Sequence, residues 1–343
     1  FLSASGGVGV VFTGLILTYA LEVPKFLKFG TMMASRVESD FNRVERILQY
    51  MKVDTEADED TSPEVRKGLP PAFPSKSTLE FRNYSMRYRD GLPLVLKNVS
   101  FTVADGEKIG IVGRTGSGKS SILVSIFRIV EGSSGSILLD GIDISTLGLR
   151  DLRASMCMIP QDPFLFSGTL RENIDPFSAV KDDKDVWDAL DMVGLKSVVG
   201  TLPEGLATVM SDGGSNFSQG QRQLICMARA LLRNARVLML DEATASIDLE
   251  TDNKIQTAIR TAFSHCTVLT IAHRLDTVMD SDRIIVMEEG VVAEIDVPKT
   301  LLDKEEGALS RLVTRSGNAD RLKSIASKSY DNLRAVDTKQ FLP

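Results

Sequence analysis

Residues 113–120 read GRTGSGKS and directly follow the apolar run Ile109-Gly110-Ile111-Val112. The segment matches G-x-x-x-x-G-K-[ST], the pattern of a phosphate-binding loop. Its glycines let successive backbone N–H groups turn toward one anion, and residues 121–127, SILVSIF, resemble a helix whose positive N-terminus faces the same point. Four constrained positions can also match by chance, but a strand before the loop and a helix after it are the context that the motif requires. Lys119 is therefore predicted to reach the outer phosphates and Ser120 a Mg²⁺ ion.

Composition limits the classes of protein that fit this loop. The chain has 343 residues, of which 43% are hydrophobic, enough for one domain with appendages or for two small domains. The net charge of −6 is opposite to the excess of basic residues that is typical of nucleic-acid-binding proteins, so we predict no nucleic-acid partner. Cys157, Cys226 and Cys266 form no C-x-x-C pair, which favours a reduced cytosolic setting without a disulfide or zinc framework. The first residue is Phe1, so we expect a piece of a longer chain.

The stretch Phe1–Leu21 carries no charged residue and is about long enough to cross a bilayer as a helix. A buried helix and a signal peptide are the alternatives, but the basic start and the cleavage site of a signal peptide are missing. Its glycines are tolerated where membrane helices pack closely. By the positive-inside rule, Lys25, Lys28 and Arg36 place the C-terminal side of this helix in the cytosol.

Four parts of the chain are predicted. The end of a transmembrane domain, its last helix, occupies residues 1–24. Residues 25–77 form a cytosolic helical extension, indicated by the spacing of Val37, Phe41, Val44 and Met51, and then an acidic and proline-rich linker. The phosphate-loop domain covers residues 78–315. The polar tail, residues 316–343, is expected to be mobile.

Apolar runs alternate with helical patterns through the phosphate-loop domain. Short β-type runs lead into the loop, Asp140-Gly141 has the composition of a two-residue hairpin turn, and residues 170–232 are mostly helical in pattern. Two further β-type runs follow at residues 237–240 and 268–271. This order predicts an α/β fold with a mainly parallel core sheet and an inserted helical portion.

Polar residues at the ends of these runs are candidates for chemistry. Asp241 and Glu242 end one run and His273 follows the other, and the carboxyl edge of a parallel sheet is where ligands bind in such folds. Asp241 could hold Mg²⁺ through water and Glu242 could take a proton from an attacking water. An ordinary acidic pair at a helix start and a structural histidine are the alternatives. Gln161 is uninformative by itself, and Tyr88 is an aromatic on an early predicted strand, a position that is more often part of the core than a platform for a ligand.

One further stretch narrows the choice among phosphate-loop proteins. Residues 217–224, FSQGQRQL, precede a helix and the strand that ends at Asp241, and they resemble the signature sequence of ABC-type ATPases. The resemblance runs from about Thr78 to Leu312. It implies an ABC-type nucleotide-binding domain over residues 78–315, with a parallel core sheet, an antiparallel β subdomain and a helical subdomain, preceded by a transmembrane helix.

The resemblance also implies a role for each site residue, with ATP and Mg²⁺ as cofactors. It assigns catalysis to Glu242, His273 and Lys119. It assigns metal binding to Ser120, Gln161 and Asp241, and residues 245–248 resemble the D-loop. It assigns nucleotide binding to Tyr88, Gly113, Arg114, Thr115, Gly116, Ser117, Gly118, Lys119, Ser120, Ser121 and Gln161. The signature residues Ser218, Gln219, Gly220 and Gln221 serve a nucleotide held by a partner domain.

In finer detail, the runs LRENIDPF and GSNFSQGQRQL resemble the second nucleotide-binding domain of subfamily C, the multidrug-resistance-associated group. The signature departs from the commonest form, LSGGQ, at Phe217 and Gln219. The site of residues 113–120 with Glu242 therefore looks competent for hydrolysis, whereas the composite site completed by residues 217–221 is a candidate for weak activity.

The resemblance implies an exporter that couples ATP hydrolysis to movement of organic anions, drugs or conjugates. Its partners are the first nucleotide-binding domain and the transmembrane domains of the same full-length protein. We expect an integral membrane protein with this domain on the cytosolic side, in the plasma membrane or alternatively in a vacuolar or other organelle membrane. An ATP-sensing regulatory or channel protein of subfamily C, and a soluble ABC ATPase, are the alternative functions.

Overall fold

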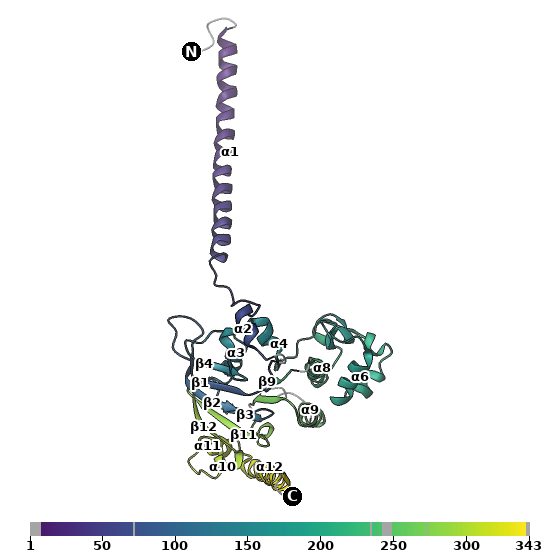
Figure 1. Cartoon of the computed structure of the whole chain (residues 1–343). Coiled ribbons are helices and arrows are strands. Elements are labelled where there is room, and N and C mark those ends of the chain that lie inside the picture. Colours follow the sequence, from purple (N-terminus) through teal and green to yellow (C-terminus); the bar gives the residue numbers. More distant parts are fainter. Residues whose placement is uncertain (1–7, 71–72, 234, 242–248, 273, 341–343) are drawn as a thin grey trace. The chain divides into compact units, whose positions relative to one another are not determined.

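A computed structural model of the chain describes residues 8–70, 73–233, 235–241, 249–272 and 274–340 (Figure 1). It divides into two compact units, Phe1–Glu56 and Ala57–Pro343. Helix α1 (Val8–Tyr50) makes up most of the described part of the first unit and is continuous for 43 residues, with Pro24 inside it. The predicted helical extension beyond Val37 is therefore confirmed.

Helix α1 is long and apolar enough to cross a membrane, with a mean hydropathy of 1.5 in its most apolar window. Large apolar side chains such as Val10, Leu17 and Phe26 are 74%, 61% and 71% exposed. The hydroxyl of Thr13 donates to the carbonyl of Gly9 at 2.7 Å, so this polar group is satisfied within the helix. A single helix of this kind is compatible with a membrane span by length and composition.

Two sheets organise the second unit. The antiparallel sheet has the order β2-β1-β4-β5, with bounds β1 (Leu79–Met86), β2 (Leu96–Val103), β4 (Ser134–Leu139) and β5 (Ile142–Asp143). The larger sheet has the order β12-β11-β3-β10-β9-β6 and is parallel except between β11 and β12. Its strands are β3 (Lys108–Gly113), β6 (Met156–Ile159), β9 (Val237–Asp241), β10 (Thr267–Ile271), β11 (Arg283–Glu288) and β12 (Val291–Asp296). The predicted mainly parallel core is confirmed.

The helical portion between β6 and β9 is also confirmed, and it contains a short two-stranded sheet that the pattern does not predict. That sheet pairs β7 (Gly168–Thr169) with β8 (Val209–Met210). In Figure 1 the teal helices α6 and α8 lie together beside the strands, and they contact each other. The elements are α5 (Leu170–Ile174), α6 (Asp183–Met192), α7 (Lys196–Gly200), η2 (Gly205–Ala207), η3 (Asp212–Gly214) and α8 (Gln219–Leu232).

Three buried clusters hold these layers together. One lies between the two sheets and contains Phe81 and Phe101, whose rings stack with centroids 4.5 Å apart, together with apolar side chains of β3 and of α3 (Lys119–Ile126). Another joins β6, β9 and β10 to the helical portion and to α9 (Leu249–Thr261). The third packs β3 and β11 against α10 (Pro298–Leu302), α11 (Ala308–Arg315) and α12 (Ala319–Gln340). Strand β3 thus has buried side chains in clusters on both of its faces.

The predicted hairpin at Asp140-Gly141 is confirmed. Asp140 and Gly141 have φ angles of +51° and +78°, the conformation of a two-residue turn that matches the twist of antiparallel strands. Leu139 pairs with Ile142 across it. The hairpin leads into η1 (Ile144–Thr146) and α4 (Leu149–Ala154), the segment that precedes β6.

The tail from Ser316, which was expected to be mobile, contains helix α12, which begins at Ala319. Its Leu322 and Ala326 are 3% and 2% exposed in the cluster with β3 and β11. Leu322 and Ala326 are four residues apart and share one face of the helix. Two buried side chains in a mainly polar segment are a weak pattern, so the sequence did not predict this helix.

The acidic end of the linker, which we call the strap (residues 58–61), is fixed on helix α4. The backbone N–H groups of Leu149 and Arg150 donate to strap carbonyls at 3.0 and 2.9 Å, and that of Gly148 donates to Thr61 Oγ1 at 2.8 Å. The first N–H groups of a helix have no acceptor inside the helix, so the strap supplies acceptors for the start of α4.

The strap also changes the pKa of a neighbouring carboxyl. The hydrogen bond from Thr61 Oγ1, at 2.5 Å, is the main cause of a lowered pKa of the Asp151 carboxyl. The hydrogen bond between Thr61 and Asp151 therefore stabilises the fold at pH values above the ordinary pKa of aspartate. This stabilisation is lost as the pH falls through the lowered pKa of Asp151. Helix α2 (Pro63–Gly68) follows the strap.

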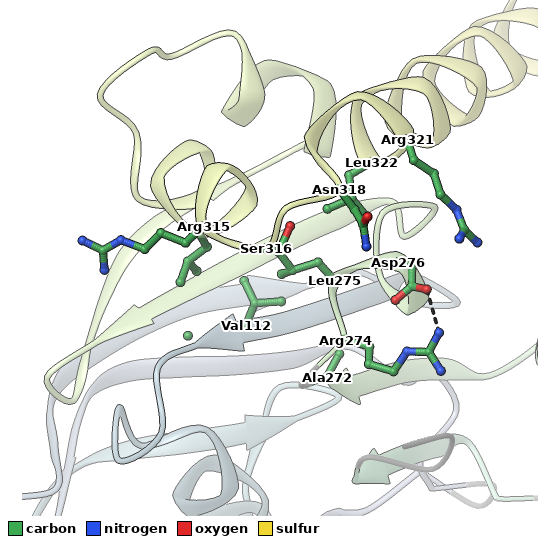
Figure 2. A pocket seen from close by; sticks show the side chains of 12 residues that line it. Val112, Ala272, Arg274, Leu275, Asp276, Arg315, Ser316, Asn318, Arg321 and Leu322 are labelled. Carbon is green, nitrogen blue, oxygen red and sulfur yellow. Dashed lines mark hydrogen bonds and ion pairs between the residues drawn. The ribbon is translucent and has the colours of Figure 1, made fainter. Parts of the chain in front are cut away.

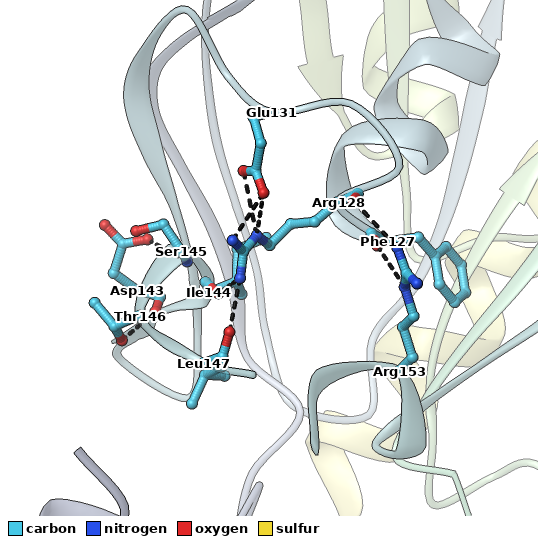
Figure 3. Close-up of polar contacts among 9 residues, drawn as sticks. All are labelled: Phe127, Arg128, Glu131, Asp143, Ile144, Ser145, Thr146, Leu147 and Arg153. Atoms are coloured by element: carbon cyan, nitrogen blue, oxygen red, sulfur yellow. Dashed lines mark hydrogen bonds and ion pairs between the residues drawn. The ribbon is translucent and has the colours of Figure 1, made fainter. Parts of the chain in front are cut away.

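Arg128 connects the end of helix α3 to the segment after the hairpin (Figure 3). Its side chain is buried, and Nη1 donates to the carbonyls of Ile144 and Leu147 at 2.9 and 2.7 Å. Nη2 contacts Glu131 at 2.7 Å, and Arg153 of α4 donates to the Arg128 carbonyl at 3.2 Å. Arg128 itself has a φ of +48°, a conformation that few side chains adopt without such contacts.

Replacing Arg128 by Met should lower the free energy of unfolding by about 3 kcal/mol, because two buried carbonyls and one end of an ion pair lose their partner. Arg82→Met is the matched control, since Arg82 is exposed and its pair with Glu80 should contribute less than about 1 kcal/mol. Urea unfolding followed by circular dichroism measures both values. Equal losses in the two variants would contradict the role given to Arg128.

Candidate functional site

The loop of residues 113–120 lies at the carboxyl end of β3, and β3 sits between β11 and β10 in the parallel part of the sheet. Gly116 and Gly118 have φ angles of +81° and +99°, and Gly118 directly precedes helix α3. These left-handed conformations turn the backbone from the strand into the helix, and glycine adopts them without a Cβ penalty. The loop therefore ends at the positive N-terminus of α3.

Lys119 holds the loop closed. Its side chain is 5% exposed, and Nζ donates to the carbonyls of Gly113 and Arg114 at 2.9 and 3.1 Å. Ser117 is also buried, and its Oγ has no hydrogen-bond partner among the residues that the structure describes. A buried cation, an orphaned hydroxyl and a helix N-terminus in one loop match what an anion requires, so the residues present fit the phosphates of a nucleotide.

Gly113 shows how tightly the loop is seated against the sheet. Its φ is +155°, and a Cβ at this position would lie 2.4 Å from the Met287 carbonyl oxygen and 2.6 Å from Ser117 Oγ. Met287 belongs to β11, the neighbouring strand. No side chain fits at Gly113 unless the sheet or the loop moves.

Strand register brings two other candidates to the edge where this loop lies. Asp241 ends β9 and pairs with Ile271 of β10, which in turn pairs with Ile111 of β3. Gln161 follows β6 by two residues, after Ile159. Because these strands are parallel, the loop, Asp241 and Gln161 all lie at the carboxyl edge of one sheet.

Glu242 and His273 fall outside the described residues. Of the described residues next to them, Asp241 ends β9 and Ala272 directly follows β10. The D-loop candidates, residues 245–248, also lie outside the described part of the chain. The catalytic assignments of these residues stay predictions.

Tyr88 lies just beyond β1 rather than on it, because the strand ends at Met86. This corrects the expectation of a strand position. The Tyr88 hydroxyl lies 3.0 Å from Ser121 Oγ at the start of α3, and the side chain is 46% exposed. An exposed aromatic ring next to the phosphate loop is accessible to the flat face of a base.

The signature residues begin helix α8. Ser218 is its N-cap, where Ser218 Oγ accepts from the Gln221 backbone N–H at 3.2 Å and Gln221 Oε1 accepts from the Ser218 N–H at 2.9 Å. This reciprocal capping box fixes the start of the helix. Ser218 is exposed and Gln219 is half-buried, whereas Gly220 is buried. The signature is thus an accessible N-terminus of a 14-residue helix.

Two polar residues of α8 were not predicted from the sequence. Gln223 is 1% exposed, and its Nε2 donates to the Gln161 carbonyl at 3.4 Å. Arg229 Nε donates to the Asn173 carbonyl at 2.8 Å. A sequence signal existed, because both residues interrupt the apolar face of a helix that is otherwise packed in the core.

A pocket of about 440 Å³ lies at the same sheet edge, under helices α11 and α12 (Figure 2). Val112 and Ala272 line its floor. At its side Arg274, the N-cap of η4 (Leu275–Thr277), forms an ion pair with Asp276 of that helix. Gly113 is its one residue in common with the phosphate loop. The pocket therefore adjoins the loop without being the candidate nucleotide site.

Comparison with known proteins gives concordant matches. A protein-family profile described as "ABC transporter" matches residues 96–245. "ATP-binding cassette sub-family C member 3" of Mus musculus is 53% identical over 291 residues, covering 84% of this chain and 19% of the relative. "ABC transporter C family member 12" of Dictyostelium discoideum is 47% identical over 331 residues, covering 95% of this chain and 25% of the relative.

A solved structure described as "Structure of a bacterial Atm1-family ABC exporter with ATP bound" matches with a TM-score of 0.72 at 31% identity. It covers 81% of this chain and 47% of that chain. The chain spans only about a fifth to a quarter of the length of the two curated relatives above.

Replacing Gly113 by Ala should weaken binding of a fluorescent ATP analogue at least about tenfold, because the new Cβ displaces Ser117 and the loop. Gly141→Ala is the matched control: its φ of +78° is equally unfavourable for alanine, but no atom lies within 4 Å of the new Cβ. Fluorescence titration of both variants measures the difference. Unchanged affinity in Gly113→Ala would show that the loop does not hold the phosphates.

Proposed function

We propose that this chain carries the ATPase domain of an ABC transporter of subfamily C, which binds Mg²⁺-ATP and hydrolyses it to drive export. The observation that carries the proposal is the loop of residues 113–120, with buried Lys119 and the orphaned Ser117 hydroxyl at the start of α3. Asp241 and Gln161 at the same sheet edge complete the described part of the site.

Each residue of the site has a task in this proposal. Tyr88 stacks on the adenine, and the amides of residues 113–121 with Lys119 neutralise phosphate charge. Ser120, Gln161 and Asp241 would hold Mg²⁺, which would supply neutralisation of phosphate charge. Lys119 must exchange its bonds to the loop carbonyls for bonds to phosphate oxygens, so ATP replaces contacts that already fix the loop.

Hydrolysis requires a base and an anchor for the γ-phosphate. Glu242 takes a proton from water as the water oxygen attacks the γ-phosphorus and the bond to the bridging oxygen of ADP breaks. In this proposal His273 steadies the γ-phosphate. ADP and inorganic phosphate are the products.

The complete protein contains more than this chain. We assign residues 1–24 to the last helix of a transmembrane domain, 25–77 to the extension and linker, 78–315 to the nucleotide-binding domain and 316–343 to the C-terminal segment. The partners are the transmembrane domains and a first nucleotide-binding domain, against which Ser218, Gln219, Gly220 and Gln221 complete a second site. The exposed N-terminus of α8 supports this trans role.

The transported molecules in this proposal are organic anions, drugs or conjugates. The protein is an integral membrane protein with this domain on the cytosolic side, in the plasma membrane or in a vacuolar or other organelle membrane. Exposed apolar helix α1 supports membrane insertion. The second candidate is an ATP-sensing regulator or channel, favoured by the departure of the signature from LSGGQ at Gln219.

Replacing Glu242 by Gln in the full-length protein should leave ATP binding intact and lower turnover by about 10²-fold or more, because the base is lost while its shape is kept. Phosphate release in membranes measures turnover, and uptake of an organic anion into inside-out vesicles measures transport. Glu172→Gln is the control, since Glu172 caps α5 away from the loop. Normal ATP turnover in Glu242→Gln would show that Glu242 is not the base. ATP turnover without transport of the organic anion would favour the regulatory protein.

A further inference from the structure

Helix α8 and the segment after β6 meet along a line of polar contacts, which we call the seam: Gln223 and Arg229 against residues 161–173. Gln223 Nε2 donates to the Gln161 carbonyl at 3.4 Å. Arg229 donates to the carbonyls of Asn173 and Phe164 at 2.8 and 3.3 Å. Helix α8 thus holds this segment at its beginning, its middle and its end.

The seam is incompletely paired. Within the described part of the chain, the buried side-chain polar atoms without a partner are Ser117 Oγ, Thr208 Oγ1, Arg222 Nε, Gln223 Oε1 and Arg229 Nη2. Three of them belong to α8, and two of those belong to seam side chains. Leaving such atoms unpaired costs free energy. The seam is therefore poised for a second arrangement in which these atoms find partners.

Gln223 connects the signature end of α8 to Gln161. Gln223 follows the signature residue Gln221 by two positions in α8, and it bonds to the backbone of Gln161. In the proposed function, on which this inference rests, Ser218–Gln221 touch the nucleotide held by the partner domain, whereas Gln161 binds the Mg²⁺ of this chain's own site. A single buried side chain thus stands between two nucleotide sites.

We propose that Gln223 is a positioning residue that sets the Gln161 backbone according to the occupancy of the signature, and so couples the two nucleotide sites. Its hydrogen bond fixes the peptide plane of Gln161, and this plane directs the Gln161 side chain toward or away from the metal. Removing a group that hydrogen-bonds to a metal ligand and fixes its orientation typically weakens metal affinity by about 10–100-fold.

Gln223→Met tests the role, because methionine keeps the length and volume of the side chain and removes both polar atoms. The background is the full-length protein carrying Glu242→Gln, which holds ATP without turnover. Mn²⁺ binding with ATP, followed by electron paramagnetic resonance, should weaken about tenfold. Binding of a fluorescent ATP analogue in the presence of chelator and the thermal unfolding temperature should not change. Gln256→Met on α9 is the control, since Gln256 is half-buried and lies outside the seam.

A double-mutant cycle tests the coupling. Gly220→Ala alters the signature and should weaken Mn²⁺ binding when Gln223 is present, but it should have no further effect beside Gln223→Met. Additive effects, or Mn²⁺ affinity in Gln223→Met equal to that in Gln256→Met, would overturn the inference. If the protein with Glu242 intact shows no ATP turnover, the proposed function fails instead. If the protein with Glu242 intact turns over ATP but Gln223→Met leaves the Mn²⁺ affinity unchanged, only the role of Gln223 is rejected.

Discussion

The chain has to reverse direction after β3 inside a fully packed sheet, and this constraint governs the rest of the second unit. Gly113 lies against the Met287 carbonyl of the neighbouring strand, so the turn can pass only as bare backbone. Lys119 then closes the loop by bonding to the carbonyls of Gly113 and Arg114. The outcome is a ring of backbone around the N-terminus of α3, and a phosphate group has the charge and shape to fill it.

The elements around this loop are tied to it by contacts between distant parts of the chain. Arg128 fixes the far end of α3 to the carbonyls that follow the hairpin. The strap satisfies the start of α4, which leads through β6 to Gln161. Gln223 meets Gln161 from the side of the signature helix. The strap and α8 therefore both contact the elements that lead to Gln161, at the edge of the sheet where Asp241 lies.

Patterns local in sequence were enough to predict the loop, the hairpin at Asp140-Gly141, the parallel core and the helical insertion, because glycine placement and apolar periodicity act over a few residues. The order of motifs also indicated a resemblance to ABC-type ATPases. Contacts across long separations could not be predicted: Thr61 meets Asp151, 90 residues later, and Gln223 meets Gln161, 62 residues earlier. Helix α12 was missed because, among its side chains that the structure describes, the buried ones are Leu322 and Ala326, which make a weak pattern in a polar segment. Tyr88 was placed on a strand because an aromatic in a β-type run does not mark where the strand ends.

Calorimetric titration of the full-length protein with Mg²⁺-ATP measures whether the loop of residues 113–120 holds the phosphates. Lys119→Ala removes the buried cation that is proposed to contact the outer phosphates. We expect saturable binding to the protein with Lys119 intact and an affinity for ATP at least about tenfold lower in Lys119→Ala, because a charge-assisted contact is lost. Equal affinity for ATP in both proteins, with the fold intact, would show that Lys119 does not bind the phosphates.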